Sequence, residues 1–100
     1  MRVQSGQETV FAHFDQGYMW AGQGDRSVTK TINFAKPFAA PPHVIVSLVG
    51  VDASNGGNLR VFASVSAVDE HHFDVTVKTW NDTRLATVEV SWIAVEAAQF

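Results

Sequence analysis

Apolar and polar residues alternate with a period of two in short runs along the chain, and turn-forming residues separate the runs. The run from Phe73 to Trp80 is the clearest, with Phe73, Val75 and Val77 on one parity. Successive strand residues point to opposite faces, so each run predicts a strand with one buried face. The predicted strands are Thr9–Phe14, Ser27–Phe34, His43–Val51, Asn58–Val68, Phe73–Trp80 and Leu85–Val95.

The spacing of these runs predicts the fold class. Five or six strands at roughly ten-residue intervals are typical of an antiparallel β-sandwich, and no window has the capped 3.6-residue apolar stripe of a helix. The run His43–Val51 is nearly continuously apolar, as in a strand covered on both faces. No repeat or linker divides the chain, so we predict one all-β domain over residues 1–100.

Composition narrows the classes of function. The 100 residues are 46% hydrophobic and 17% charged, which is typical of a folded domain. The net charge of −3 argues against nucleic acid as a partner. No stretch is apolar enough for a membrane span, and the N-terminus lacks the apolar run of a secretory signal. There is no cysteine, so the compartment stays open, and action outside the cell or at its surface is compatible with the sequence.

The sequence carries no motif of a known catalytic site. It lacks a nucleophile elbow, a phosphate-binding glycine loop and a zinc-binding His-Glu-x-x-His motif. The neighbours His71 and His72 would diverge on a strand, so solvated turn histidines are favoured over a metal site. We therefore expect no enzyme activity, no cofactor and no metal.

Arg60 and Trp80 occupy the outward parity of strands whose other face is apolar. An outward Trp covers a sheet edge, packs in an oligomer interface or contacts a ligand. Trp80 also precedes the polar turn Asn81-Asp82-Thr83. An aromatic face packs against the apolar side of a sugar, and planar Arg, Asp and Asn groups bind hydroxyls. Parity alone favours packing over ligand contact.

A second polar loop, Gly22-Gln23-Gly24-Asp25-Arg26, precedes the strand at Ser27. Its simplest interpretation is a turn in which Asp25 accepts hydrogen bonds from nearby backbone amides. Alternatively, it offers a carboxylate and an exposed backbone group to a hydroxylated ligand. By itself the loop favours the turn.

An ordered series of segments resembles the H-type lectin domain. It begins with Phe34-Ala35-Lys36-Pro37-Phe38, Pro41-Pro42 and the strand Val44–Leu48. It continues through Asp52, Asn58-Leu59-Arg60-Val61, Phe73, Thr79-Trp80-Asn81-Asp82-Thr83 and Val90-Ser91-Trp92-Ile93-Ala94, and the opening Arg2–Gly6 is similar to snail members. The match is strong from Phe34 to Ala94 and weaker from Gln7 to Gly24.

The resemblance implies a sugar-binding function without catalysis. H-type lectins are antiparallel β-sandwiches that form trimers, sometimes stacked into hexamers, and bind terminal galactose or N-acetylgalactosamine between protomers. By this resemblance Arg60 would bind hydroxyls from one protomer and Trp80 would form an apolar wall from the next. Asn81 follows that Trp, and Asp25 with the backbone of Gly24 would form the acidic loop.

Three departures from snail members bear on this expectation. Asn81 replaces a His after the Trp but still donates and accepts hydrogen bonds. Ala86 stands where an aromatic residue covers the acetamido group, so a preference for N-acetylgalactosamine is not implied. The stapling cysteines are absent, so an oligomer would rest on packing alone. The alternatives are a structural trimerisation or attachment module without sugar binding and, less favoured, a metal-dependent hydrolase using the histidines.

Overall fold

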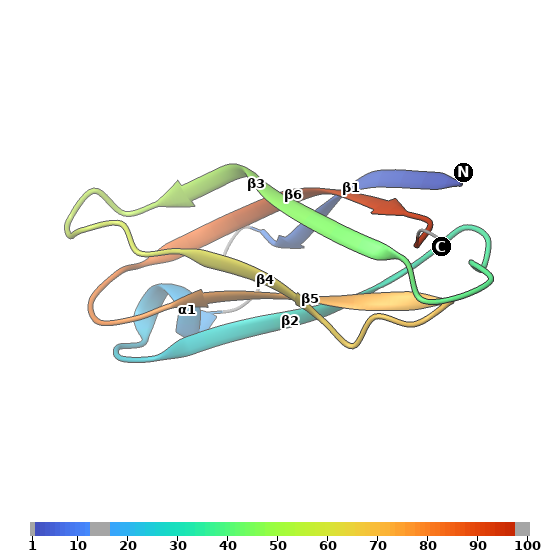
Figure 1. Cartoon of the computed structure of the whole chain (residues 1–100). Helices are drawn as coiled ribbons and strands as arrows, with labels where there is room; N and C mark the ends of the chain where they lie inside the picture. Colours follow the sequence, from blue (N-terminus) through green and yellow to red (C-terminus); the bar gives the residue numbers. More distant parts are fainter. Residues whose placement is uncertain (1, 13–16, 98–100) are drawn as a thin grey trace.

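The computed structural model describes residues 2–12 and 17–97, which form six strands and one short helix (Figure 1). The strands are β1 (Val3–Phe11), β2 (Arg26–Asn33), β3 (His43–Ala53), β4 (Phe62–Ser66), β5 (His72–Thr79) and β6 (Leu85–Val95), and the helix is α1 (Gly17–Ala21). This arrangement confirms the predicted all-β architecture.

The strands form two antiparallel three-stranded sheets packed face to face, as Figure 1 shows. The first sheet has the order β1-β6-β3 and the second the order β2-β5-β4. Strands β6 and β5 are therefore central, and β1, β3, β2 and β4 are edges. The start of β1 and the end of β6 lie at one end of the sandwich, and α1 lies at the other.

The core lies between the sheets and follows the predicted parity. Phe73, Val75 and Val77 of β5 are fully buried, and Val88 and Val90 face them from β6. Phe34, Phe73 and Trp92 form an aromatic cluster with centroid distances from 5.3 to 5.9 Å, to which Phe38 adds an edge contact at 5.0 Å. Gly6 is required beside this cluster because a Cβ there would lie 2.9 Å from Trp92 Nε1.

Two N-terminal elements differ from the prediction. Strand β1 starts at Val3, whereas the prediction placed its start at Thr9. The prediction missed the first part of the strand because its inward positions are Gln4, Gly6 and Glu8, which are not apolar and so give a weak polar–apolar alternation. His13 and Phe14 lie outside the described residues. Helix α1 was not predicted, since five residues are too short to show a periodic apolar stripe; only Met19 in it is buried.

Strand β4 is shorter than the predicted Asn58–Val68. The strand ends before Ala67, which has a positive φ of 52°. It begins only at Phe62 because Asn58 and Arg60 form hydrogen bonds to the β5–β6 turn instead of extending the sheet. The prediction that Arg60 lies within a strand was therefore wrong. Trp80 likewise lies one residue beyond β5, and 41% of its side chain is exposed.

The two open sides of the sandwich differ in chemistry. On the β1–β2 side, Lys30 Nζ donates to the Thr9 carbonyl at 3.0 Å and pairs with Glu8 at 3.2 Å. Gln4 adds further bonds to the backbone of residues 35 and 36. These polar contacts join the two sheets along this side.

The edge strands β3 and β4 and the loop between them instead expose large apolar side chains, which are Leu48, Val49, Val51, Leu59 and, on the outer face of β4, Phe62. We call these five residues the apolar edge. The prediction that the His43–Val51 strand is covered on both faces was wrong for a single chain, because β3 is an edge strand. Ile45, on the outer face of the same strand, is 64% exposed.

Candidate functional site

Three loops meet at the end of the sandwich that carries α1. They are residues 22–26, which lead into β2 and include its first residue, residues 54–60 between β3 and β4, and residues 80–84 between β5 and β6. The Gly24 amide donates to the Asn81 carbonyl at 3.0 Å, and the Ser54 amide donates to the Arg84 carbonyl at 3.0 Å. We call these loops, with Lys78 and Thr79 at the end of β5, the tip.

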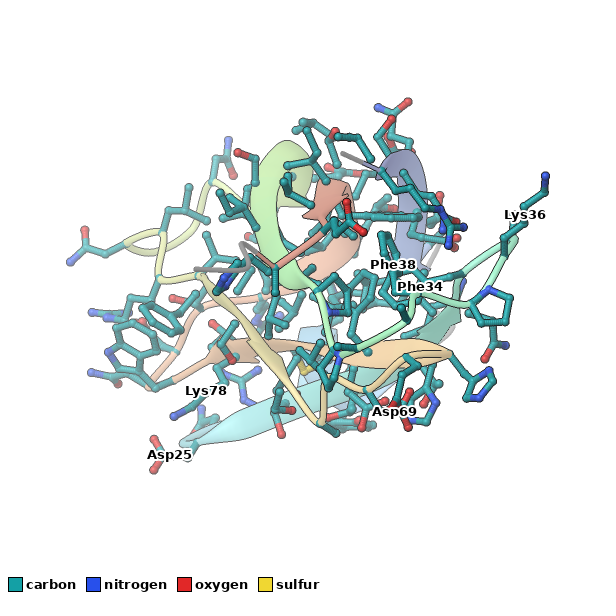
Figure 2. All side chains as sticks on the ribbon, turned by 45° about the vertical axis from the view of Figure 1, so that its right-hand side comes forward. Asp25, Phe34, Lys36, Phe38, Asp69 and Lys78 are labelled. Carbon is teal, nitrogen blue, oxygen red and sulfur yellow. The ribbon has the colours of Figure 1, made fainter. Side chains whose placement is uncertain are left out.

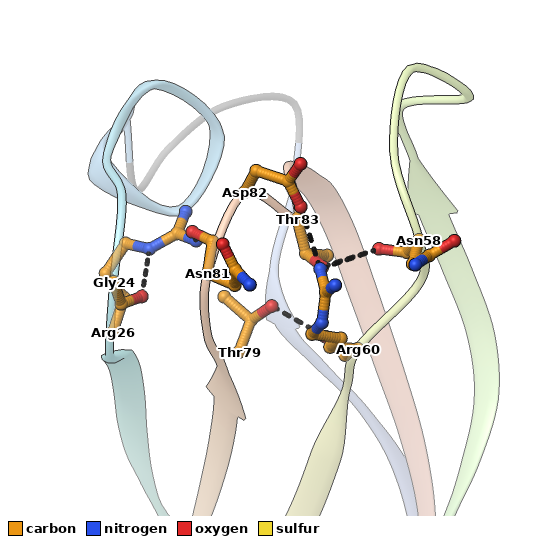
Figure 3. Close-up of polar contacts among 8 residues, drawn as sticks. All are labelled: Gly24, Arg26, Asn58, Arg60, Thr79, Asn81, Asp82 and Thr83. Carbon is orange, nitrogen blue, oxygen red and sulfur yellow. Dashed lines mark hydrogen bonds and ion pairs between the residues drawn. The ribbon is translucent and has the colours of Figure 1, made fainter.

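Arg26 holds the first loop against the third (Figure 3). Its Nε donates to the Gly24 carbonyl at 2.9 Å, and its guanidinium also donates to the carbonyls of Asn81 at 2.9 Å and Met19 at 3.1 Å. The side chain has the inward parity of β2 and the residue is only 9% exposed. Its positive charge is therefore compensated by backbone oxygens and by no carboxylate of the described residues.

The turn that carries Asn81 has a constrained backbone. Asn81 has a positive φ of 59°, a conformation that Asn adopts more readily than most residues. Its carbonyl accepts from both Gly24 and Arg26, while its side chain is exposed. The resulting turn fixes Trp80 on one side and Asp82 on the other.

Arg60 is held in place by the same turn. Its Nη1 donates to Asp82 Oδ1 at 2.8 Å and to Thr83 Oγ1 at 3.1 Å, and Thr79 Oγ1 donates to the Arg60 carbonyl at 2.6 Å (Figure 3). The Thr79–Arg60 bond places Arg60 beside the residue that directly precedes Trp80. Arg60 and Trp80 are therefore neighbours within one chain.

A hollow of about 290 Å³ lies beside Trp80. It is lined by Asp25, Phe62, Lys78, Thr79 and Trp80. Two exposed aromatic side chains, one carboxylate and one ammonium group thus share a space near the lower limit of small-ligand pockets. A second hollow, of about 270 Å³, lies on the other side of the turn and is lined by Ser54, Gly56, Asp82 and Arg84.

The structure brings all five residues predicted for the site to the tip. Asp25 and Trp80 line the same hollow, and Arg60 and Asn81 adjoin it through the turn. Gly24, however, uses its amide for Asn81 and its carbonyl for Arg26, so its N–H is engaged within the chain. Ala86 is 2% exposed and presents no surface for a ligand in a single chain.

Sequence reasoning missed three contributors to the tip. Arg26 was treated only as a loop residue, although an Arg on the parity of Val28 and Ile32 signals a buried, bonded cation. Phe62 was overlooked as an aromatic on an otherwise polar strand face, and Lys78 was assigned outward but given no role.

His43, His71 and His72 lie at the opposite end. The Asp69 carboxylate accepts from the amides of His71 at 2.8 Å and His72 at 2.9 Å, and these bonds lower the pKa of Asp69. His72 Nδ1 lies 3.3 Å from the same carboxylate. Within residues 2–12 and 17–97, no group of three or more His, Asp and Glu side chains is placed to hold a metal ion, and no helix could cross a membrane.

The fold and the tip together define a β-sandwich with a polar and aromatic surface at one end, and comparisons with known proteins name its class. The family profile of the H-type lectin domain matches residues 29–95. The chain therefore belongs to the H-type lectin domain family, as its motifs suggested. A protein of Fuscovulum blasticum described as "ATP synthase subunits region ORF 7" is 34% identical over 94 residues, covering 93% of this chain and 82% of that protein.

Solved structures agree on the fold. Recombinant discoidin II of Dictyostelium discoideum superposes with a TM-score of 0.86 at 23% identity, covering 98% of this chain. Wild-type discoidin II gives the same TM-score and identity over 97% of the chain. The chain spans 38% and 37% of the length of these two structures, respectively. At this identity they establish the lectin fold alone.

Proposed function

We propose that this protein is a lectin that binds terminal galactose-type sugars at the tip, without catalysis. The observation that carries this proposal is the exposed Trp80 beside the Asp25 carboxylate in one hollow, in a chain of the H-type lectin family. The indole face would pack against the apolar side of a pyranose ring, while Asp25 accepts hydrogen bonds from its hydroxyls.

Arg60 and Asn81 would complete the polar contacts. The bond between Arg60 Nη1 and Asp82 fixes the direction of the guanidinium before a ligand arrives, which lowers the entropic cost of binding. The exposed Asn81 amide both donates and accepts. Because Ala86 provides no aromatic cover for an acetamido group, we expect galactose to bind about as well as N-acetylgalactosamine.

We further propose that the lectin acts as a trimer, with the apolar edge buried between protomers. One side of the sandwich is joined by polar contacts and the other exposes five large apolar side chains, and exposed apolar surface of this kind marks an interface. Phe62 belongs to both the apolar edge and the hollow, so a neighbouring protomer would adjoin each sugar site. A single site would bind with a Kd of roughly millimolar to micromolar, and several sites on one surface would add avidity.

A glycan array run with the wild type and the Trp80→Ala variant tests the sugar site. We expect signals on terminal galactose or N-acetylgalactosamine, and loss of those signals in the variant, because a central aromatic contact contributes about 2 kcal/mol or more. The Ile45→Ala variant is the control, since it also truncates an exposed apolar side chain but lies on the outer face of β3.

Two outcomes would contradict the proposal. Full binding by a folded Trp80→Ala variant would move the sugar site elsewhere. If the folded, oligomeric wild type binds no glycan on the array, the alternative of a structural trimerisation or attachment module would instead be favoured.

A further inference from the structure

Lys78 occupies the hollow without an acidic partner. No described residue forms an ion pair with it, and it lines the same hollow as Trp80 and Asp25. On the outer face of the second sheet its cross-strand neighbours are Ser27 and Phe62, neither of which is acidic. Asp74, on the same strand face, is four residues away, about 13 Å along the strand, and accepts from Thr31 at 2.6 Å.

The tip is also positive within an acidic protein. Its three loops and the end of β5 carry four basic and two acidic side chains, which are Arg26, Arg60, Lys78, Arg84, Asp25 and Asp82, whereas the whole chain has a net charge of −3. Even if Asp52 at the end of β3 is included, the local charge stays positive. The net charge of the tip therefore has the opposite sign to that of the molecule, which favours the approach of anions.

The partners of the basic side chains at the tip also favour the binding of an anion. The Arg60 charge is paired with Asp82, whereas Arg26 donates to carbonyl groups and is paired with no carboxylate of the described residues. Asp25 offers hydrogen-bond acceptors for sugar hydroxyls, and it cannot itself bind an anion. Among the described residues that line this hollow, Lys78 is the one basic side chain, and it is exposed and free for a ligand.

We infer that the preferred sugar carries an anionic substituent, and that Lys78 binds it. This inference rests on the proposed sugar site and names its ligand class as an acidic galactose-type glycan. The pyranose ring would contact Trp80 and Asp25, and a carboxylate or sulfate on the same or the adjoining residue would face the Lys78 ammonium.

The test compares a neutral sugar with its anionic counterparts on the intact protein. Binding of methyl β-galactoside, methyl β-galacturonoside and 3-O-sulfo- and 6-O-sulfo-galactose is measured by titration calorimetry. We expect at least one anionic sugar to bind about three- to tenfold more tightly than the neutral one, because an ammonium–anion contact at a half-exposed site adds this much. Comparison of the galacturonoside with the two sulfated sugars shows whether the anionic group that binds is a carboxylate or a sulfate.

Three variants assign the preference to Lys78. In Lys78→Gln the ratio of anionic to neutral affinity should fall to about one, whereas Lys78→Arg should keep it above one because the charge remains. Lys36→Gln removes an exposed ammonium at the far end of the sandwich and is the matched control (Figure 2). Thermal unfolding of each variant confirms its fold.

A salt titration of the wild type provides a second test that needs no variant. Because the Lys78 contact is solvent-exposed, the preference for the anionic sugar should shrink as ionic strength rises. Equal wild-type affinity for neutral and anionic sugars, or a preference that persists in Lys78→Gln, overturns the inference while leaving the sugar site intact. Absence of binding by every sugar overturns the proposed function itself.

Discussion

Arg26 links three segments that are distant in sequence. Within the described part of the chain, its guanidinium donates to backbone carbonyls alone, at the end of α1, at Gly24 and at Asn81. Backbone carbonyls cannot leave the site as a rotating side chain can, so the loop with Asp25 and the turn with Trp80 keep a fixed separation. We therefore assign Arg26 a positioning role in the proposed sugar site.

Replacing Arg26 with Met should destabilise the fold and weaken sugar binding together. The change leaves carbonyl groups unpaired in a buried setting, which we expect to cost about 2 to 4 kcal/mol in the free energy of unfolding. Urea denaturation of the variant measures this cost. Ser27→Ala, at an exposed position of the same strand, should stay within about 0.5 kcal/mol of the wild type. A stable Arg26→Met protein with unchanged sugar affinity would refute the positioning role.

At the scale of single residues, the sequence was informative where chemistry is local. Trp80 and Arg60 stood out because each has the outward parity of a predicted strand whose other face is apolar, and both lie at the tip. The engagement of the Gly24 amide could not be predicted, since its partner Asn81 is 57 residues away and only the packed loops bring them together. The resemblance to the family supplied the link between the loop and the Trp.

At the scale of elements, strands with a clean two-residue period were predicted well. Strands β5 and β6 are central, so one parity of each is buried and the apolar pattern is strong. The pattern failed at the edges, where β1 tolerates polar inward residues and β3 exposes apolar ones. The start of β4 was misplaced because residues 58 and 60 form side-chain and carbonyl bonds to another turn, which periodicity does not record.

The turn before β5 makes stability depend on pH through Asp69. Hydrogen bonds from the backbone amides of His71 and His72 lower the pKa of Asp69 below its ordinary value of 3.8. A carboxyl group with a lowered pKa in the folded state stabilises the protein above its unfolded pKa, and this contribution is lost as the pH falls through the folded value.

The Asp69→Asn variant tests this dependence, because it keeps the oxygen acceptor and removes the charge. The wild type should have the higher Tm at neutral pH, and the difference should narrow as the pH falls below 3.8. Asp74→Asn, on the adjoining strand, is the control for removal of a negative charge. A Tm difference that is the same at neutral and strongly acidic pH would show that the charge of Asp69 does not act in this way.

At the scale of the whole molecule, the difference between the two open sides supports the proposed oligomer. The continuous apolar run in β3 predicted cover on both faces, yet in a single chain the apolar edge is uncovered. The sequence pattern and the structure agree if a second copy supplies that cover. No pattern within one chain specifies how many copies assemble, so the proposal of a trimer, and not of another oligomer, rests on the resemblance to the family.

Substitution of Val49 by Lys should dissociate the oligomer without unfolding the chain. Val49 is 49% exposed and lies at a β-bulge in the apolar edge, so a charge there is solvated in the monomer but buried without a partner in an interface. Light scattering coupled to size exclusion should give about three times the 10.9 kDa chain mass for the wild type and one chain mass for the variant. Ile45→Lys, on the outer face of the same strand, should stay assembled. If Ile45→Lys dissociates and Val49→Lys does not, the interface lies on the outer face of the first sheet, and the sugar site at the tip would then be formed by one chain alone.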